Sequence, residues 1–337
     1  MLYSLQFLRA FAVFAVLWVH AFDNWGGIGV DIFFIISGFI MLYIIKEKKR
    51  NPFEFMSLRI IRILPLYWLM TFIFIILGLS LTELSILNII KSLFFIELGA
   101  PILRVGWTLQ YEFFLYLICS IALFLSYKFT SYFIVIFLLV SSLIVDIFLF
   151  PERAYGHFLE FIFGIILYYM YVNTKSSFRF SKKAYFGIFL IGFFISIFTY
   201  SNFFNELGFL QYRFLTFGIP ALIMVYAVLF YEKHYEFKLN NFLFLIANSS
   251  YSIYLSHRIF YDLFMLNITR NTEIIQYYVY GFFLIFVGLT LGILVYKFIE
   301  IPLLNYLKDV YFSSSLLSKI KNWSIFKGGF FDKLVMK

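Results

Sequence analysis

The sequence is dominated by apolar runs of roughly 20 residues, each separated from the next by a short polar stretch. An α-helix of that length crosses the ~30 Å hydrocarbon core of a bilayer. A chain inside lipid must satisfy its own backbone hydrogen bonds, which restricts membrane spans to helices and closed barrels. The runs are continuously apolar and do not alternate as the strands of a barrel do. We therefore predict an all-α, polytopic membrane helix bundle.

About ten segments are long and apolar enough to serve as membrane spans. They are 5–22, 28–45, 62–80, 107–126, 130–150, 156–172, 184–201, 212–230, 242–264 and 276–298. The segment 82–100 is also apolar, but it contains Glu83, Lys91 and Glu97. We interpret it as an interfacial helix, with a re-entrant helix as the alternative.

The distribution of positive charge predicts the orientation of this bundle. Only 13% of the residues are charged, yet the net charge is +9. With a cytoplasmic N-terminus, 21 of the 27 Lys and Arg residues fall on the cytoplasmic side. That is the asymmetry of the positive-inside rule. Both termini are therefore predicted to be cytoplasmic, and the excess of positive charge needs no nucleic-acid partner.

The chain is expected to form one integral-membrane domain over residues 1–305. Residues 306–337 are expected to form a basic amphipathic cytoplasmic tail, because lysines there alternate with Trp323, Phe326, Phe330 and Phe331. Such a segment suits the anionic inner leaflet. Cys119 is the single cysteine, so no internal disulfide is expected.

The first span carries two ionisable groups, Arg9 and His20. Eleven residues at about 100° each place them within about 20° of one face, roughly 16 Å apart along the axis. Ionisable groups inside a membrane are costly and usually functional. The alternative is that Arg9 snorkels to lipid headgroups and His20 caps an interface independently. Their common face favours a shared role.

Three more ionisable residues are predicted near the depth of His20, namely Asp31, Glu112 and His257. An imidazole close to carboxylates is suited to proton transfer near pH 7. The alternative is a structural ion pair of Asp31 or Glu112 with Arg258. Asp31 could also be a carboxylate that stabilises a helix N-terminus.

On the cytoplasmic side, Arg59 and Arg62 precede Pro65 and share one helical face. Two arginines in this register suit a planar, bidentate grip on phosphate. Together with Arg9 and residues 46–50 they predict a cationic mouth. An elongated anionic ligand could reach from this mouth to the outer acid–base site. A nucleotide thioester fits that description, and a polyprenyl-phosphate lipid fits nearly as well.

Six motifs give a more specific indication. They are LRAFAVFAVLWVH, GVDIFFIISGFI, RIIRILPLYW, WTLQYEFFLY, SYSIYLSH and FIEIP. Through these motifs, in this order, the chain resembles the integral-membrane acyltransferase-3 family, which includes bacterial O-acetyltransferases of surface polysaccharides. Two departures are WTL, where WSL is common, and Arg258 with Ile259, where a proline often occurs nearby.

The resemblance implies transfer of an acyl group, usually acetyl, from cytoplasmic acyl-CoA to a hydroxyl of a surface or exopolysaccharide sugar. It implies a multi-pass protein of the bacterial plasma (inner) membrane. It also implies that His20 is catalytic and that Arg9 is essential. We expect His20 to act as general base, with Glu112 or Asp31 orienting its other ring nitrogen. A transient acyl-His20 intermediate is the alternative to direct transfer.

Arg9, Arg59 and Arg62 are expected to bind the phosphates of the acyl-CoA, which is the donor substrate. His257, Tyr254 and Trp107 are expected on the side of the acceptor.

The expected partners are acyl-CoA, a glycan or lipid-linked sugar acceptor, and membrane lipids. No nucleic acid is expected, and no metal, because no Cys/His spacing suggests a metal site. A transporter or flippase for a lipid-linked sugar would also explain the basic mouth and the buried polar groups. A non-catalytic membrane subunit of an export complex is a third hypothesis.

Overall fold

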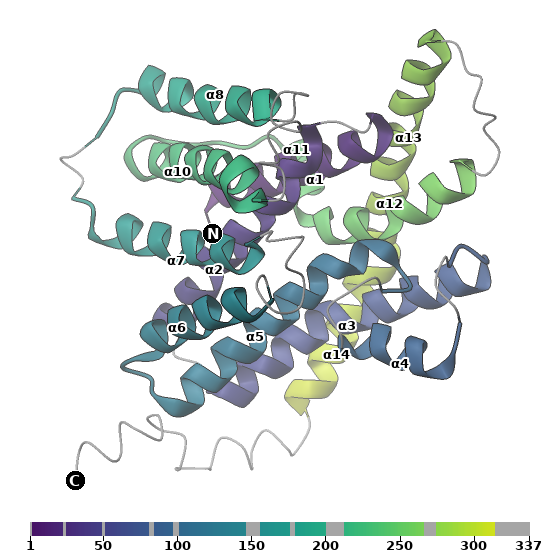
Figure 1. Ribbon diagram of the computed structural model, residues 1–337, viewed down its shortest axis with the longest axis horizontal. Coiled ribbons are helices and arrows are strands. Elements are labelled where there is room, and N and C mark those ends of the chain that lie inside the picture. Colours follow the sequence, from purple (N-terminus) through teal and green to yellow (C-terminus); the bar gives the residue numbers. More distant parts are fainter. Residues whose placement is uncertain are drawn as a thin grey trace. The chain divides into compact units, whose positions relative to one another are not determined.

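The fold is known from a computed structural model, which describes residues 2–22, 25–48, 51–80, 84–96, 101–145, 156–175, 179–199, 212–265 and 274–313. All regular elements within these ranges are helices (Figure 1). The α-helices are α1 (Tyr3–Phe22), α2 (Ile28–Lys48), α3 (Pro52–Ile76), α4 (Ile86–Phe94), α5 (Trp107–Leu125), α6 (Thr130–Leu143), α7 (His157–Asn173), α8 (Lys182–Thr199), α10 (Ile219–His234), α11 (Asn241–Asn248), α12 (Ser250–Met265), α13 (Ile274–Val295) and α14 (Ile301–Ser313). Two 3₁₀ turns, η1 (Trp25–Gly27) and η2 (Arg104–Gly106), and two π-helices, η5 (Phe214–Gly218) and η6 (Tyr296–Glu300), complete the order.

Seven helical stretches within the described ranges are long and apolar enough to cross a membrane. They are Tyr3–Phe22, Ile28–Glu47, Pro52–Ile76, Arg104–Leu125, Lys182–Thr199, Phe214–His234 and Gln276–Ser313. The helices α6 and α7 are apolar but shorter. The prediction of an all-α polytopic bundle is thus confirmed. The count of about ten spans and the cytoplasmic position of both termini stay predictions.

The third helix begins ten residues before its predicted span of 62–80. Its start is fixed by Asn51, whose side chain accepts a hydrogen bond from the backbone N–H of Glu54 at 2.8 Å. Pro52 occupies the first turn, where its missing N–H costs nothing. Pro65 lies inside the helix without ending it.

The predicted span 242–264 is two helices in the structure. The hydroxyl of Ser249, between α11 and α12, donates to the carbonyl of Leu245 at 2.7 Å. The backbone N–H of Ser249 also donates to this carbonyl, at 3.0 Å, so the hydroxyl adds a second hydrogen bond to it. With 8 and 16 residues, α11 and α12 are each too short to cross a bilayer alone.

The last predicted span, 276–298, continues through η6 into α14, which ends at Ser313. The expected tail beginning at residue 306 is therefore helical over its first part. Residues 314–337, with the lysines and aromatic residues on which that expectation rests, lie outside the described residues.

The chain forms two compact units, each of which is described by itself. The first unit comprises Met1–Tyr43 and Leu138–Ile293, and the second comprises Ile44–Phe137 and Leu294–Lys337. In the first unit α8 and α10 lie side by side, and α1 packs against α10, α11 and α12 (Figure 1). In the second unit α3 packs against α4, α5 and α14.

Two charged residues at the end of α10 fasten neighbouring helices of the first unit. Glu232 accepts hydrogen bonds from the backbone N–H groups of Tyr3 at 2.8 Å and Ser4 at 2.9 Å, at the start of α1. Lys233 donates to the carbonyl of Thr174 at 2.7 Å, just after α7. A carboxylate at a helix N-terminus and an ammonium at a C-terminus both complement the helix dipole. The pair therefore fixes the ends of α1 and α7 on α10.

The motif GVDIFFIISGFI packs closely on both sides of α2. A Cβ atom on Gly29 would lie 2.3 Å from the carbonyl oxygen of Ala12 on α1. A Cβ atom on Gly38 would lie 2.1 Å from the carbonyl oxygen of Phe161 on α7. Nine residues at about 100° each put these glycines on opposite faces. The motif thus lets α2 fit between α1 and α7.

In the second unit, α4 is held by side chains of α3. The hydroxyl of Tyr67 donates to the carbonyl of Ser92 at 3.1 Å, and the indole N–H of Trp68 donates to the carbonyl of Leu93 at 2.8 Å. With nine residues, α4 is too short to span a bilayer. It exposes four large apolar side chains, namely Ile86, Leu87, Ile90 and Phe94. This amphipathic helix suits the predicted interfacial position.

Candidate active site

The structure brings His20, near the end of α1, against His257 on α12. Their ring centroids are 5.0 Å apart, and Tyr261 meets both rings edge to face. His257 is fully buried, and its Nδ1 lies 3.2 Å from the carbonyl oxygen of Ile253. A carbonyl only accepts, so Nδ1 of His257 carries a proton and Nε2 is the acceptor. That Nε2 has no hydrogen-bond partner among the described residues of the first unit.

Arg258, the next residue on α12, connects His20 to a carboxylate. Its Nε and Nη2 contact the two carboxylate oxygens of Asp262 at 2.9 and 2.7 Å. Its Nη1 lies 3.4 Å from Nδ1 of His20. A guanidinium only donates, so Nδ1 of His20 accepts and the neutral ring carries its proton on Nε2. Nδ1 of His20 thus contacts the Arg258 guanidinium, which is itself paired with Asp262. The sequence had suggested a carboxylate as the direct partner of His20.

Glycines of α13 allow that helix to lie close behind this site. A Cβ atom on Gly292 would lie 2.5 Å from Cα of Ile253, one turn before His257. A Cβ atom on Gly288 would lie 3.1 Å from Leu17 and 3.5 Å from Cβ of His257. Backbone packing by α13 therefore supports both helices that carry the histidines.

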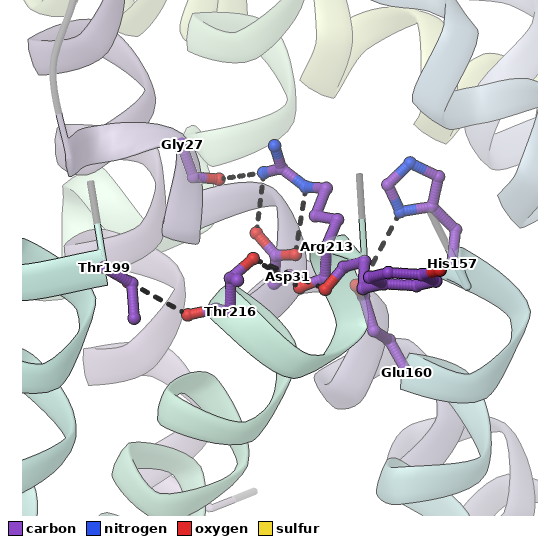
Figure 2. Close-up of polar contacts among 8 residues, drawn as sticks. Gly27, Asp31, His157, Glu160, Thr199, Arg213 and Thr216 are labelled. Carbon is purple, nitrogen blue, oxygen red and sulfur yellow. Dashed lines mark hydrogen bonds and ion pairs between the residues drawn. The ribbon is translucent and has the colours of Figure 1, made fainter. Parts of the chain in front are cut away.

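Asp31 is fully buried in α2 and forms a two-point ion pair with Arg213 (Figure 2). Nε of Arg213 donates to Oδ1 of Asp31 at 3.1 Å, and Nη2 donates to Oδ2 at 2.7 Å. The same Nη2 donates to the carbonyl of Gly27 at 2.7 Å. Arg213 directly precedes the π-helix η5, so the pair joins the start of α2 to that helix. The sequence-based alternative of an Asp31–Arg258 pair is wrong, because each residue has a different partner.

Two further buried ionisable residues, His157 and Glu160 in the first turn of α7, lie beside this ion pair (Figure 2). Nδ1 of His157 is 3.7 Å from a carboxylate oxygen of Glu160, and both side chains are almost fully buried. Sequence reasoning passed over both residues and did not single out Arg213 as a site residue. The depth argument used for His20 would have found the first two if it had been applied to the span 156–172.

Two residues expected on the acceptor side lie in different units. Tyr254 is buried in the first unit, with its ring centroid 5.9 Å from that of His257. Trp107 begins α5 in the second unit, where its ring centroid lies 6.1 Å from that of Tyr111. Tyr254 is therefore a direct neighbour of His257, and the acceptor-side roles of Tyr254 and Trp107 stay predictions.

In the second unit, Arg59 and Arg62 lie near Tyr116 of α5. The Arg59 guanidinium is 5.8 Å from the centroids of Phe55 and Tyr116, and both arginines interact electrostatically with the Tyr116 hydroxyl. That hydroxyl donates to the carboxylate of Glu112. Glu112 thus belongs, within its own unit, to the neighbourhood of the two arginines. Its predicted action on His20 stays a prediction.

Arg62 makes no hydrogen bond or ion pair with the part of the second unit that the structure describes, although its charge acts on Tyr296 of η6 as well as on Tyr116. Its guanidinium donors are therefore available to an anion. Arg9 is partly buried in α1 of the first unit. Its participation in one mouth with Arg59 and Arg62 stays a prediction, and residues 49 and 50 lie outside the described residues. No group of three or more His, Cys, Asp or Glu in the described ranges could hold a metal ion.

Comparison with known proteins decides the family. Residues 2–297 match the acyltransferase domain family over nearly the whole chain. The chain belongs to this acyltransferase family. The resemblance drawn from the six motifs is thereby confirmed, and the protein is an acyltransferase with several membrane-spanning helices.

Two relatives add detail. The chain is 29% identical over 248 residues to "Exopolysaccharide production protein ExoZ" of Rhizobium meliloti (strain 1021). The matched region covers 69% of this chain and 75% of that protein. It is 42% identical over 77 residues to "Putative peptidoglycan O-acetyltransferase YrhL" of Bacillus subtilis (strain 168), which covers 20% of this chain and 12% of that protein. No solved structure matches the chain significantly.

Proposed function

We propose that this protein transfers an acyl group, in the first instance acetyl, from cytoplasmic acyl-CoA to a hydroxyl of a surface or exopolysaccharide sugar in the bacterial plasma membrane. Membership of the acyltransferase family supports group transfer. The names of the two relatives support a polysaccharide acceptor and an oxygen as the acylated atom. The observation that carries the proposal is the contact of His20 with both His257 and Arg258 at the end of a membrane helix.

His20 is the proposed general base. An imidazole titrates near neutral pH, and a positioned base contributes typically 10²–10⁴-fold to the rate. It takes the proton of the acceptor hydroxyl as that oxygen attacks the thioester carbonyl, and it returns the proton to the leaving thiolate. The buried ring of His257 and the edge of Tyr261 hold the imidazole of His20 in place.

Arg59, Arg62 and Arg9 are the proposed donor-binding residues, which would hold the phosphates of CoA. Charge-assisted contacts from guanidinium to phosphate are among the strong hydrogen bonds in proteins. Arg62 supports this role best, because its donors have no partner among the described residues of the second unit. Glu112 and Tyr116 would then orient Arg59, in place of the predicted action of Glu112 on His20.

The test uses inside-out membrane vesicles that contain the full-length protein, radiolabelled acetyl-CoA and the polysaccharide of the host. We expect label in the polysaccharide with the wild type, and at least a hundredfold slower labelling with His20→Ala. The matched control is His234→Gln, which alters another histidine of the first unit that bonds to Tyr185. It should label like the wild type.

The same vesicles separate the competing hypotheses. Unimpaired labelling by His20→Ala would remove the general-base assignment. No labelling by the wild type, together with movement of a lipid-linked sugar across the membrane, would favour a flippase over an acyltransferase. Mass spectrometry of the polysaccharide with and without the protein then identifies the acylated sugar and the mass of the acyl group.

A further inference from the structure

We propose that Arg258 is a catalytic residue that stabilises the oxyanion formed on the thioester carbonyl, and that Asp262 is the residue that positions it. This inference rests on the acyl transfer proposed above. It gives a function to a cation that stands beside the proposed base.

The orientation of the Arg258 guanidinium is fixed from one side. Its Nε–Nη2 edge meets the two oxygens of Asp262 at 2.9 and 2.7 Å, which is the bidentate geometry that suits a carboxylate. The opposite corner, Nη1, then points at Nδ1 of His20. Asp262 lies four residues after Arg258 on the same helix, the spacing at which two side chains meet on one helix face.

The Arg258 guanidinium also has N–H groups that neither Asp262 nor His20 engages. A guanidinium has five N–H groups. Two of them are engaged by Asp262 and one faces His20, and Arg258 makes no further hydrogen bond to the described residues of the first unit. The contact with His20 is 3.4 Å, longer than the 2.7–3.2 Å of an ordinary N–H hydrogen bond. It is therefore easily exchanged for a stronger acceptor, such as an oxyanion.

The position meets the requirement for an oxyanion donor. In acyl transfer the base and the oxyanion donors must both come within about 3 Å of the reacting group. Arg258 and His20 are already neighbours, and the side chains of Arg258 and Asp262 are only 19% and 15% exposed. A preorganised donor in such a poorly solvated site stabilises developing charge far better than water does.

The reaction step balances as follows. The acceptor oxygen forms a bond to the thioester carbonyl carbon and gives its proton to Nδ1 of His20. The carbonyl π electrons move to the oxygen, and Nη1–H of Arg258 turns from Nδ1 to that oxyanion. Collapse of the intermediate restores the carbonyl and breaks the C–S bond. The CoA thiolate leaves and receives the proton from His20. The same N–H group of Arg258 thus contacts Nδ1 of His20 before the reaction and leaves it free to accept the proton during the reaction.

The experiment measures steady-state kinetics of the full-length protein in nanodiscs, with acetyl-CoA as donor and the host polysaccharide as acceptor. For Arg258→Gln we expect kcat to fall about 10²–10³-fold, the range for loss of one oxyanion donor, with both KM values within about twofold of the wild type. For Asp262→Asn, which keeps the cation but loosens its direction, we expect about a tenfold fall in kcat. Arg258→Lys should recover part of the rate lost in Arg258→Gln.

The control is Lys238→Gln, which breaks an exposed Lys–Glu pair and should leave kcat and both KM values unchanged. A wild-type kcat in Arg258→Gln overturns this inference and leaves the proposed function intact. So does a loss that appears only in the acceptor KM, because Arg258 would then bind an anionic acceptor. A wild type that transfers no acetyl group overturns the proposed function and this inference with it. Should Arg258→Gln fail to fold, the kcat values of Asp262→Asn and Arg258→Lys decide. A lowered kcat in these two variants supports the inference, and a wild-type kcat in both overturns it.

Discussion

Replacing Arg213 by Gln is expected to destabilise the first unit strongly, because it strands a buried carboxylate. Asp31 is fully buried, and both of its oxygens accept from Arg213, at 3.1 and 2.7 Å. The substitution also removes the 2.7 Å hydrogen bond to the carbonyl of Gly27. Removing one partner of a buried ion pair typically costs about 3–5 kcal/mol. We expect a loss of that size in the free energy of unfolding.

The double variant makes the reasoning quantitative. Asp31→Asn alone leaves the Arg213 guanidinium without its counter-charge, so it should also be costly. Asp31→Asn combined with Arg213→Gln removes both charges and leaves two amides that can bond to each other. The double variant should therefore lose less than the sum of the single variants, by roughly 0.5–3 kcal/mol for residues in contact.

The assay is unfolding in detergent micelles by titration with a denaturing detergent, followed by circular dichroism. The exposed pair of Lys238 and Glu236 serves as control, since its side chains are 81% and 76% exposed. Its removal should produce no measurable change. Two results would refute the buried-pair account. One is a free energy of unfolding of Arg213→Gln within about 1 kcal/mol of the wild type. The other is a loss in the double variant equal to the sum of the losses in the two single variants.

Acyl transfer by the same variants separates two roles for Asp31. If Asp31 orients His20, Asp31→Asn should lose transfer even where the protein stays folded, while folded Arg213→Gln keeps it. If Asp31 only fixes the start of α2, both variants should lose transfer in proportion to the fraction that unfolds. The structure favours the second outcome, because Arg213 already occupies both carboxylate oxygens of Asp31.

Two further predictions concern the support of the histidines and the donor site. Gly292→Ala would place a Cβ atom 2.5 Å from Cα of Ile253, so we expect a loss of about 1–3 kcal/mol and slower transfer. Gly187→Ala is the control, because a Cβ atom there would meet no other atom within 4 Å, and it should not destabilise the protein in the same assay. Equal losses of stability in Gly292→Ala and Gly187→Ala would contradict the close packing of α13. Arg62→Ala should raise the KM for acetyl-CoA by about 10–100-fold, the equivalent of one charged hydrogen bond, with little change in the acceptor KM. Arg179→Ala, an exposed arginine elsewhere, is the control, and an unchanged donor KM in Arg62→Ala would exclude the phosphate role.

Much of the secondary structure follows from local sequence. A run of about 20 apolar residues must form a helix in lipid, because no water is present to satisfy an unpaired backbone. That reasoning located α1 and α2 to within a few residues. It missed the early start of α3, because Asn51 and Pro52 begin a helix within a polar stretch. It also missed the break at Ser249, where α11 ends inside an apolar run.

The depth of each ionisable residue was equally accessible from the sequence, because depth depends only on helix rise and the position of a residue along its span. That argument singled out Arg9, His20, Asp31 and His257 before any contact was known. It did not single out His157 and Glu160, which lie in a span that was treated as uniformly apolar.

Partners, by contrast, were decided only by tertiary structure. Sequence depth allowed Asp31 to pair with Arg258, whereas in the structure Asp31 pairs with Arg213, 182 residues away, and Arg258 pairs with Asp262, four residues away. An ion pair in a helix bundle requires contact distance, and contact depends on which helix faces meet. Those faces are set by backbone approaches such as that of Gly38 on Phe161, which depend on the whole packing and not on the depth of any one residue. The sequence by itself thus determined the membrane helices and the charged groups they carry, and packing decided that His20 meets His257 and Arg258.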